Sequence, residues 1–167
     1  IAGVVLVAVA CVWQPHQVAA GAARVTMLDV GQGLSVVVET RRHVLVYDAG
    51  PSFRSGSDAG QLVVVPFLHA RGIRALDRLV VSHDDNDHKG GAFSVADALR
   101  TDALALGPGV PPVPDFAGVR DDGCHRGDGW TWDGVEFRWL HPGAAAHARD
   151  NDNSCVLLVR AGPQTVL

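Results

Sequence analysis

Short apolar runs rich in β-branched residues alternate with polar turns over the first part of this chain. Three such runs predict strands at residues 24–30, 34–40 and 43–47. The segments between them, Gly31-Gln32-Gly33 and Thr40-Arg41-Arg42, favour turns. A polar loop rich in Gly and Ser follows at residues 51–60. The pattern therefore predicts a domain that opens with a group of β-strands.

The period of the apolar positions changes in the middle of the chain. Residues 63–71 suit a helix, with Pro66 near its start and Gly72 where a C-cap belongs. A buried strand is predicted over 76–82, and one helix over 88–100. Further short strands are predicted at residues 103–106, 130–132, 135–140, 155–160 and 165–167, and the dipeptide Asp133-Gly134 is the strongest hairpin signal. This order of elements predicts a mixed α/β sandwich.

The first 13 residues are apolar and carry no charge. They are too few for a full membrane span, which needs about 20 residues, and they lack the basic start of a signal peptide. Trp13 followed by Gln14-Pro15-His16 is typical of the interfacial end of a helix leaving a bilayer, although an ordinary buried segment is the alternative. We interpret residues 1–17 as the tail of a transmembrane helix, 18–23 as a linker and 24–167 as one domain.

Composition places the chain among folded proteins and gives little support to simple charge-driven partners. The 167 residues are 47% hydrophobic, which favours a single domain with a real core. The formal net charge is -4, so electrostatics alone give no reason to expect a nucleic-acid partner. A metal site can still bring phosphate to an acidic protein, so the charge weakens that idea without excluding it.

The three cysteines, Cys11, Cys124 and Cys155, contain no C-x-x-C pair. They therefore predict neither a zinc knuckle nor a disulfide framework. A single Cys124–Cys155 bridge in an oxidising compartment stays open as an alternative to free thiols.

One stretch, Ser82 to Gly91, concentrates chemistry directly after the predicted buried strand. It contains two imidazoles and three carboxylates within six residues: His83, Asp84, Asp85, Asp87 and His88. Like charges this close repel unless a cation neutralises them, and this donor set suits Zn, Mn or Fe rather than Ca. The alternative is a solvated loop that caps the following helix, with Asp87 as N-cap. The pair Gly90-Gly91 predicts a close approach of the backbone to the site.

The pattern H-x-D-x-D-H-x-G-G resembles the H-x-H-x-D-H metal motif of the metallo-β-lactamase fold, with Asp85 where most members have His. That exchange is similar to ComEC, a family of DNA-uptake competence proteins in which a membrane channel domain is followed by such a hydrolase domain. Further stretches resemble the same family over about residues 24–167: Leu28-Asp29-Val30-Gly31-Gln32-Gly33, Tyr47-Asp48-Ala49-Gly50, Leu140-His141-Pro142, and Asn151-Asp152-Asn153-Ser154-Cys155-Val156-Leu157. The resemblance implies an αββα sandwich, incomplete at its C-terminal side.

Carried over position by position, the resemblance assigns His83 and Asp85 to a first metal ion and Asp87 and His88 to a second. The ions would be Zn or Mn, and a bridging water would be the nucleophile. Asp48 would support the site from the end of its strand, although a plain turn residue is the alternative. Asp87 and Asp48 are thus the candidate catalytic residues.

Several other polar residues have weaker claims. Asp29 and Gln32 either shape the loop beside the site or serve plain turn chemistry. His141 is interpreted as a structural hairpin residue rather than a ligand, and His147 as a solvated loop residue.

The ligand set that the resemblance implies is incomplete on this chain. The family continues with a G-D segment, whose Asp bridges the metals, and an H-H-G-S segment with another ligand, and neither occurs here. The histidine of the superfamily's third motif has no clear counterpart, and Asn153 lies near its place. About half of the ligands are therefore present, and we expect weak metal retention and little activity from this chain alone.

The resulting hypothesis is a metal-dependent phosphodiester hydrolase domain of a membrane DNA-uptake protein. It would lie outside the cytoplasm at the bacterial inner membrane, act on DNA, single-stranded by expectation, and work with the competence machinery. One alternative is a thioester or lactone hydrolase on the same fold. The other is a non-catalytic domain that handles DNA.

Overall fold

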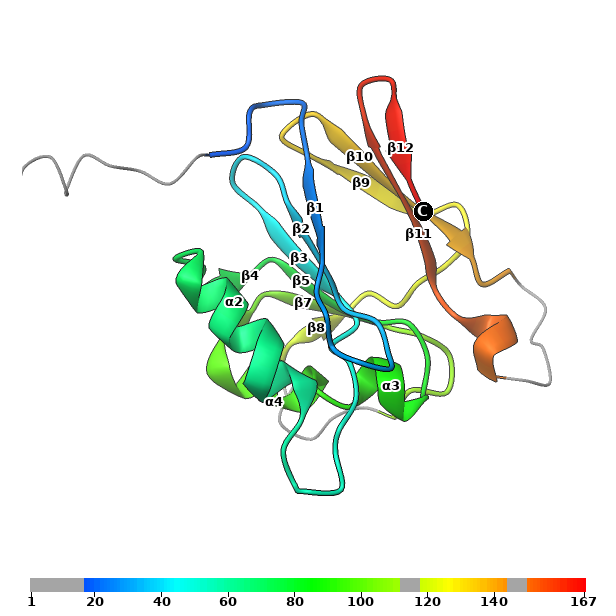
Figure 1. Ribbon diagram of the computed structural model, residues 1–167. Helices are drawn as coiled ribbons and strands as arrows, with labels where there is room; N and C mark the ends of the chain where they lie inside the picture. Colours follow the sequence, from blue (N-terminus) through cyan, green and yellow to red (C-terminus); the bar gives the residue numbers. More distant parts are fainter. Residues whose placement is uncertain (1–16, 112–117, 144–149) are drawn as a thin grey trace, which may run out of the picture.

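The computed structural model describes residues 17–111, 118–143 and 150–167, which form three layers (Figure 1). Helices cover one face of a six-stranded sheet, and a four-stranded sheet packs against its other face. Among the described helices, none combines the length and apolar character needed to cross a membrane. The predicted membrane-helix tail at residues 1–17 lies almost entirely outside the described residues, as does His147.

The first sheet starts antiparallel and continues parallel, in the order β1-β2-β3-β5-β7-β8. Strands β1, β2 and β3 pair antiparallel, whereas β3, β5, β7 and β8 pair parallel. The bounds of these strands are Arg24–Met27, Val36–Glu39, Val44–Tyr47, Arg78–Val81, Ala103–Leu106 and Arg120–Asp121. Carboxyl ends of parallel strands share one edge of a sheet, so the loops that follow β3 and β5 meet there.

The second sheet is antiparallel throughout, in the order β12-β11-β10-β9. Its strands are β9 (Gly129–Trp132), β10 (Val135–His141), β11 (Val156–Ala161) and β12 (Gln164–Val166). The predicted hairpin at Asp133-Gly134 is confirmed, because both residues have the positive φ angles, 50° and 87°, that a tight hairpin turn requires.

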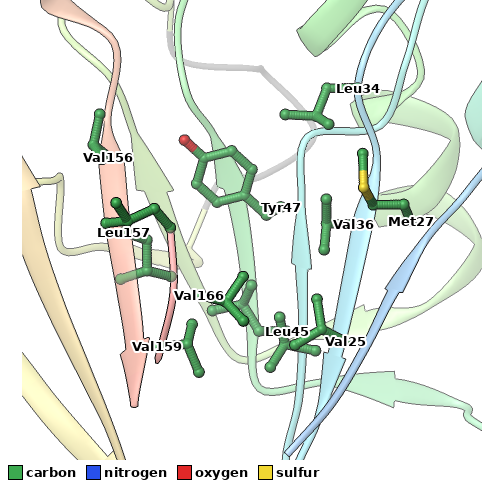
Figure 2. A pocket seen from close by; sticks show the side chains of 12 residues that line it. Val25, Met27, Leu34, Val36, Leu45, Tyr47, Val156, Leu157, Val159 and Val166 are labelled. Carbon is green, nitrogen blue, oxygen red and sulfur yellow. The ribbon is translucent and has the colours of Figure 1, made fainter. Parts of the chain in front are cut away.

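The two sheets enclose an apolar core that stays open at one edge. Its centre contains fully buried side chains such as Leu45, Val80 and Phe137. A cavity of about 320 Å³ lies between β1 and β12, and Figure 2 shows Tyr47 and Val159 facing it from opposite sheets. The Tyr47 hydroxyl donates a hydrogen bond to the Cys155 carbonyl, and burial is the main reason why the pKa of Tyr47 is raised.

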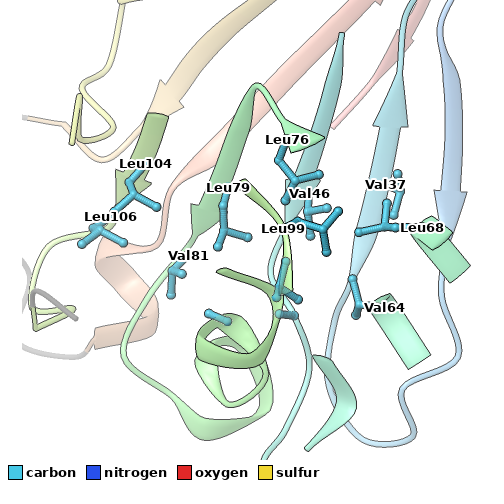
Figure 3. Packing of buried hydrophobic residues seen from close by; sticks show 13 residues of the cluster. Val37, Val46, Val64, Leu68, Leu76, Leu79, Val81, Leu99, Leu104 and Leu106 are labelled. Atoms are coloured by element: carbon cyan, nitrogen blue, oxygen red, sulfur yellow. The ribbon is translucent and has the colours of Figure 1, made fainter. Parts of the chain in front are cut away.

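A second core lies between the first sheet and the helices (Figure 3). The π-helical turn η1 (Gly60–Val64) and helix α2 (Val65–Ala70) place Val64 and Leu68 against Val37 and Val46 of the sheet, and α4 (Ala92–Ala98) adds further apolar residues. All four of these side chains are fully buried, and each stabilises the fold by about 1.5–3 kcal/mol. The helix predicted over 63–71 is thus confirmed, with an earlier start.

The single helix predicted over 88–100 is wrong. The structure has two shorter helices, α3 (Asn86–Lys89) and α4, separated by Gly90 and Gly91. The Gly91 amide donates to the Gly50 carbonyl at 3.0 Å, outside the helix, so the first helix cannot continue through it.

The strand predicted over 76–82 is also divided, into β4 (Ala75–Leu76) and β5. Asp77 separates the two because its side chain accepts a hydrogen bond from the Val44 amide at 2.8 Å. The short strand β6 (Arg100–Thr101), which pairs with β4, and strand β8 were not predicted. Both are two residues long, so they carry no periodic signal.

Candidate metal centre

The candidate site lies at the carboxyl ends of β3 and β5. Asp48 directly follows β3, and Ser82 and His83 directly follow β5, which brings together residues 34 positions apart in the sequence. The chain then turns through Asp84 and Asp85 into α3, which carries Asp87 and His88. The fold therefore gathers all four predicted ligands and Asp48 on one edge of the first sheet.

Asp48 accepts several of the hydrogen bonds at this edge. Its side chain is completely buried, and its backbone has a φ of 58°, which is uncommon for a residue other than glycine. Its carboxylate accepts hydrogen bonds from the Ser82 amide, from the Ser82 hydroxyl and from His88 Nδ1, each at 2.7 Å. These bonds link Asp48 to both sides of the candidate site, at Ser82 and at His88.

The four predicted ligands lie in two pairs. His83 Nε2 is 3.3 Å from Asp85 Oδ2, and His88 Nε2 is 3.8 Å from Asp87 Oδ2. The two pairs adjoin, because the centroids of the two imidazole rings are 4.1 Å apart. Since the Asp48 carboxylate can only accept, His88 Nδ1 carries the proton in this bond. When the ring is neutral, Nε2 then has a free lone pair that can bind a metal ion.

Proton equilibria at His88 reflect its acidic surroundings. The hydrogen bond to Asp48 is the largest cause of a raised His88 pKa; burial opposes it, and the charges of Asp48, Asp87 and Asp85 reinforce it. Metal ions bind neutral imidazole, so a raised pKa means that protons compete more strongly with a metal at this residue.

The site is packed closely by glycines, as Gly90-Gly91 predicted. A Cβ on Gly91 would lie 2.3 Å from the Ala49 carbonyl oxygen, and one on Gly33 would lie 2.3 Å from the Asp87 carbonyl oxygen. The Ala49 amide also donates to the His88 carbonyl at 2.8 Å. These contacts fix the loop of the candidate ligands against the strand end that carries Asp48.

The donor chemistry fits a transition metal, but the number of converging donors is small. Imidazole nitrogens beside carboxylate oxygens suit Zn, Mn or Fe. Within residues 17–111, 118–143 and 150–167, however, no group of three or more His, Cys, Asp or Glu side chains is arranged to hold one ion. The described chain thus provides two pairs of donors rather than a closed coordination sphere.

The remaining predicted residues play local roles. Asp29 accepts a hydrogen bond from the Gly31 amide at 3.2 Å, which is turn chemistry, and Gln32 is exposed beside it. His141 Nδ1 lies 2.9 Å from the Ser154 carbonyl oxygen, a bond to backbone that agrees with its structural interpretation. Asp84 forms an ion pair with Lys89 at 2.6 Å instead of joining the two donor pairs.

Two features at this edge were missed or left open by the sequence. Ser82 lies in the acidic stretch and no motif assigns it a role, yet it contacts Asp48, His83 and His88. Cys124 and Cys155 form a disulfide, with Cα atoms 5.8 Å apart, and the Cys155 amide donates to the Ser82 carbonyl at 3.0 Å. Only the fold brings these two cysteines together across 31 positions.

Comparison with known proteins agrees with this geometry. The model of the metallo-beta-lactamase superfamily matches residues 28–167. Competence protein ComA of Neisseria gonorrhoeae is 39% identical over 93% of this chain, and Recombination protein 2 of Haemophilus influenzae is 38% identical over 86%. The chain spans 20% and 18% of the length of these two relatives. The resemblance to the competence family that the sequence motifs predicted is thereby confirmed.

Solved structures agree on the fold. A metallo-beta-lactamase from Cronobacter sakazakii with an HARLDQ motif superposes with a TM-score of 0.60 at 19% identity, covering 92% of this chain and 60% of the lactamase. The predicted α/β sandwich of metallo-β-lactamase type is thus confirmed. Because the family model matches most of the chain, residues 28–167, this chain belongs to the metallo-beta-lactamase superfamily.

Proposed function

We propose that this chain carries part of the metal centre of a phosphodiester hydrolase that acts on DNA during its uptake by a bacterial cell. The observation that carries the proposal is the pair of donor pairs, His83 with Asp85 and His88 with Asp87, beside the buried Asp48. Nucleic acid as the substrate class is supported by relatives that are described as competence and recombination proteins.

In this proposal, His83 and Asp85 hold one divalent ion and Asp87 and His88 hold a second, Zn or Mn. The bound ions would polarise a phosphoryl oxygen and lower the pKa of the attacking water. The contribution of this chain is positional. Asp48 orients His88 through its Nδ1–H, and Asp87, in the first turn of α3, would also accept a proton from the nucleophile.

The coordination sphere is completed, on this proposal, by residues of the natural protein outside this chain. The chain spans 20% and 18% of the length of its two relatives, so the natural protein has further residues that can supply ligands. A hydrolase centre with open positions for water and substrate typically needs at least three protein ligands per zinc ion.

We further propose that the domain lies outside the cytoplasm of a bacterial cell, attached to the inner membrane through other parts of the natural protein, including the apolar residues 1–17. The disulfide between Cys124 and Cys155 supports this placement, because disulfides persist in oxidising compartments such as the periplasm. The competence machinery would deliver DNA to the domain there.

The test is metal-dependent cleavage of single-stranded DNA by a protein that extends this chain to the full lactamase-like domain. Metal content and cleavage with Mn²⁺ or Zn²⁺ would be measured for the wild type and for His83→Ala and Asp87→Ala. His69→Ala and Asp97→Ala are the matched controls, because both residues are exposed on helices away from the donor pairs. We expect cleavage to fall at least about 100-fold in the first two variants and to persist in the controls.

The alternatives predict different results. If the extended protein binds metal but leaves DNA intact, a thioester or lactone substrate should be tried. If it binds neither metal nor hydrolysable substrate while retaining DNA, the domain handles DNA without catalysis. Cleavage that survives both His83→Ala and Asp87→Ala would contradict the proposed centre.

A further inference from the structure

We propose that Ser82 is a positioning residue: it holds the proton of the neutral His83 ring on Nδ1, so that Nε2 is free to bind a metal ion. The proposal rests on the function proposed above and adds a residue that none of the motifs assigned. Ser82 is 2% exposed and follows the last residue of β5. Its hydroxyl oxygen lies 2.7 Å from Asp48 Oδ2 and 2.9 Å from His83 Nδ1.

The single hydroxyl proton decides the direction of both bonds. The carboxylate of Asp48 can only accept hydrogen bonds. A hydrogen bond to a carboxylate is also stronger than one to a neutral imidazole. The Ser82 hydroxyl therefore donates to Asp48, and its oxygen can only accept from the imidazole. It follows that His83 carries its proton on Nδ1 and leaves Nε2 bare.

The unprotonated Nε2 of His83 points toward the other candidate metal ligands. His83 Nε2 lies 3.3 Å from Asp85 Oδ2, so the ring presents a lone pair on the side where Asp85 presents its carboxylate. His88 reaches the same state by bonding Asp48 directly at 2.7 Å. One buried aspartate thus orients both histidines, His88 by contact and His83 through the hydroxyl of Ser82.

The position of Ser82 is held independently of its hydroxyl. Its amide donates to Asp48 Oδ1 at 2.7 Å, and its carbonyl accepts from the Cys155 amide at 3.0 Å. A Cβ on Gly107 would lie 2.1 Å from the same carbonyl oxygen, so the residue that follows β7 packs tightly against this backbone. Removing the hydroxyl should therefore leave the backbone in place and remove the contacts that the hydroxyl makes with Asp48, His83 and His88.

The test is nitrogen NMR of the whole chain labelled with ¹⁵N-histidine, without metal, at about pH 8, where imidazole is mostly neutral. In the wild type we expect His83 to be protonated on Nδ1. In Ser82→Ala the proton should move to Nε2, because the Asp85 carboxylate is then the nearest acceptor. Ser82→Thr keeps a hydroxyl and should restore the wild-type tautomer.

Ser35→Ala is the matched control. Ser35 is 1% exposed, and its hydroxyl has no hydrogen-bond partner among the described residues, so this variant removes a buried hydroxyl without touching His83. A second readout is Zn²⁺ affinity of the extended protein, which should fall about 10-fold or more in Ser82→Ala and stay unchanged in Ser35→Ala.

Two results would overturn the inference. One is a wild-type His83 protonated on Nε2, which needs no variant to fold. The other is the same His83 tautomer in Ser82→Ala as in Ser35→Ala. Failure of the hydrolase function is separable from both: loss of DNA cleavage with the expected tautomers would remove the proposed reaction and leave the role of Ser82 toward His83 intact.

Discussion

Two aspartates with buried side chains lie near the two ends of strand β3, and their hydrogen bonds have different consequences. Asp48 follows the strand, and Asp133 lies in the β9–β10 turn beside the strand's start. They are the two residues other than glycine with positive φ among the described residues, 58° and 50°. Each accepts several hydrogen bonds from segments distant in sequence.

The two aspartates differ in the further contacts that their hydrogen-bond partners make. Asp133 accepts from the Thr40 hydroxyl, from Arg42 and from His43, all in one turn, so these bonds tie the second sheet to the first. Asp48 accepts hydrogen bonds from Ser82 and His88. The Ser82 hydroxyl also contacts His83, and His88 Nε2 lies beside Asp87. The bonds to Asp133 therefore join two segments of the fold, whereas the bonds to Asp48 orient side chains next to the candidate ligands.

The largest effect should come from Asp48→Ala. This change leaves the buried Ser82 amide and hydroxyl and His88 Nδ1 without their acceptor, which should lower the free energy of unfolding by about 3–5 kcal/mol. It should also abolish high-affinity Zn²⁺ binding in the extended domain. Urea unfolding and metal titration measure the two effects.

The comparison gives this prediction its control. Asp133→Ala should lower stability too, but should leave Zn²⁺ affinity within about twofold, because no donor of Asp133 contacts the site. If Asp133→Ala impaired metal binding as much as Asp48→Ala, the distinction between the two ends of β3 would be lost.

The next largest effect concerns the disulfide at the Asp48 end. Replacing both cysteines, Cys124→Ser with Cys155→Ser, opens a loop of 31 positions. The unfolded chain then gains conformational entropy, which should lower the free energy of unfolding by about 3–4 kcal/mol. The measurement is thermal unfolding of the variant against the oxidised wild type. Equal melting temperatures for the two would indicate that the bridge contributes nothing to the folded state in solution.

The fold was predictable where the signal was local. Asp133-Gly134 has the φ preferences of a hairpin turn, and the strand at 103–106 is one uninterrupted apolar run, so both were placed correctly. The helix over 88–100 failed because its apolar spacing persists through Gly90-Gly91, while a hydrogen bond to the distant Gly50 breaks it. Local patterns cannot contain that bond.

The site was predictable in part for the same reason. His83, Asp85, Asp87 and His88 are neighbours in sequence, so their density was visible without a fold. Ser82 was not identified, because a lone serine before a histidine resembles ordinary loop chemistry. Its role depends on Asp48, 34 positions earlier, which only the parallel pairing of β3 and β5 brings within 2.7 Å.

A smaller effect is expected at the other end of the comparison, from Asp133→Asn. Burial raises the pKa of Asp133, but hydrogen bonds from His43, Thr40 and Arg42 together hold it far below the usual range. Its stabilising contribution is therefore complete above about pH 4 and is lost as the pH falls toward the folded-state pKa. Urea unfolding should show a loss of about 1–2 kcal/mol at pH 6 that shrinks by pH 2.5. A constant difference across this range would contradict the lowered pKa.

The smallest effect is expected from Arg42→Ala, which separates charge from hydrogen bonding at Asp133. The guanidinium lies 3.1 Å from Asp133, but the Arg42 side chain is 78% exposed, so water and salt screen the pair. The Arg42 amide keeps its bond to Asp133 at 2.8 Å whatever the side chain. Urea unfolding should therefore show a loss below about 0.5 kcal/mol, insensitive to added salt. A loss above about 1.5 kcal/mol that disappears in high salt would mean that charge, rather than the ring of hydrogen bonds, holds this end of β3, and that the two aspartates differ in their physics as well as in their purpose.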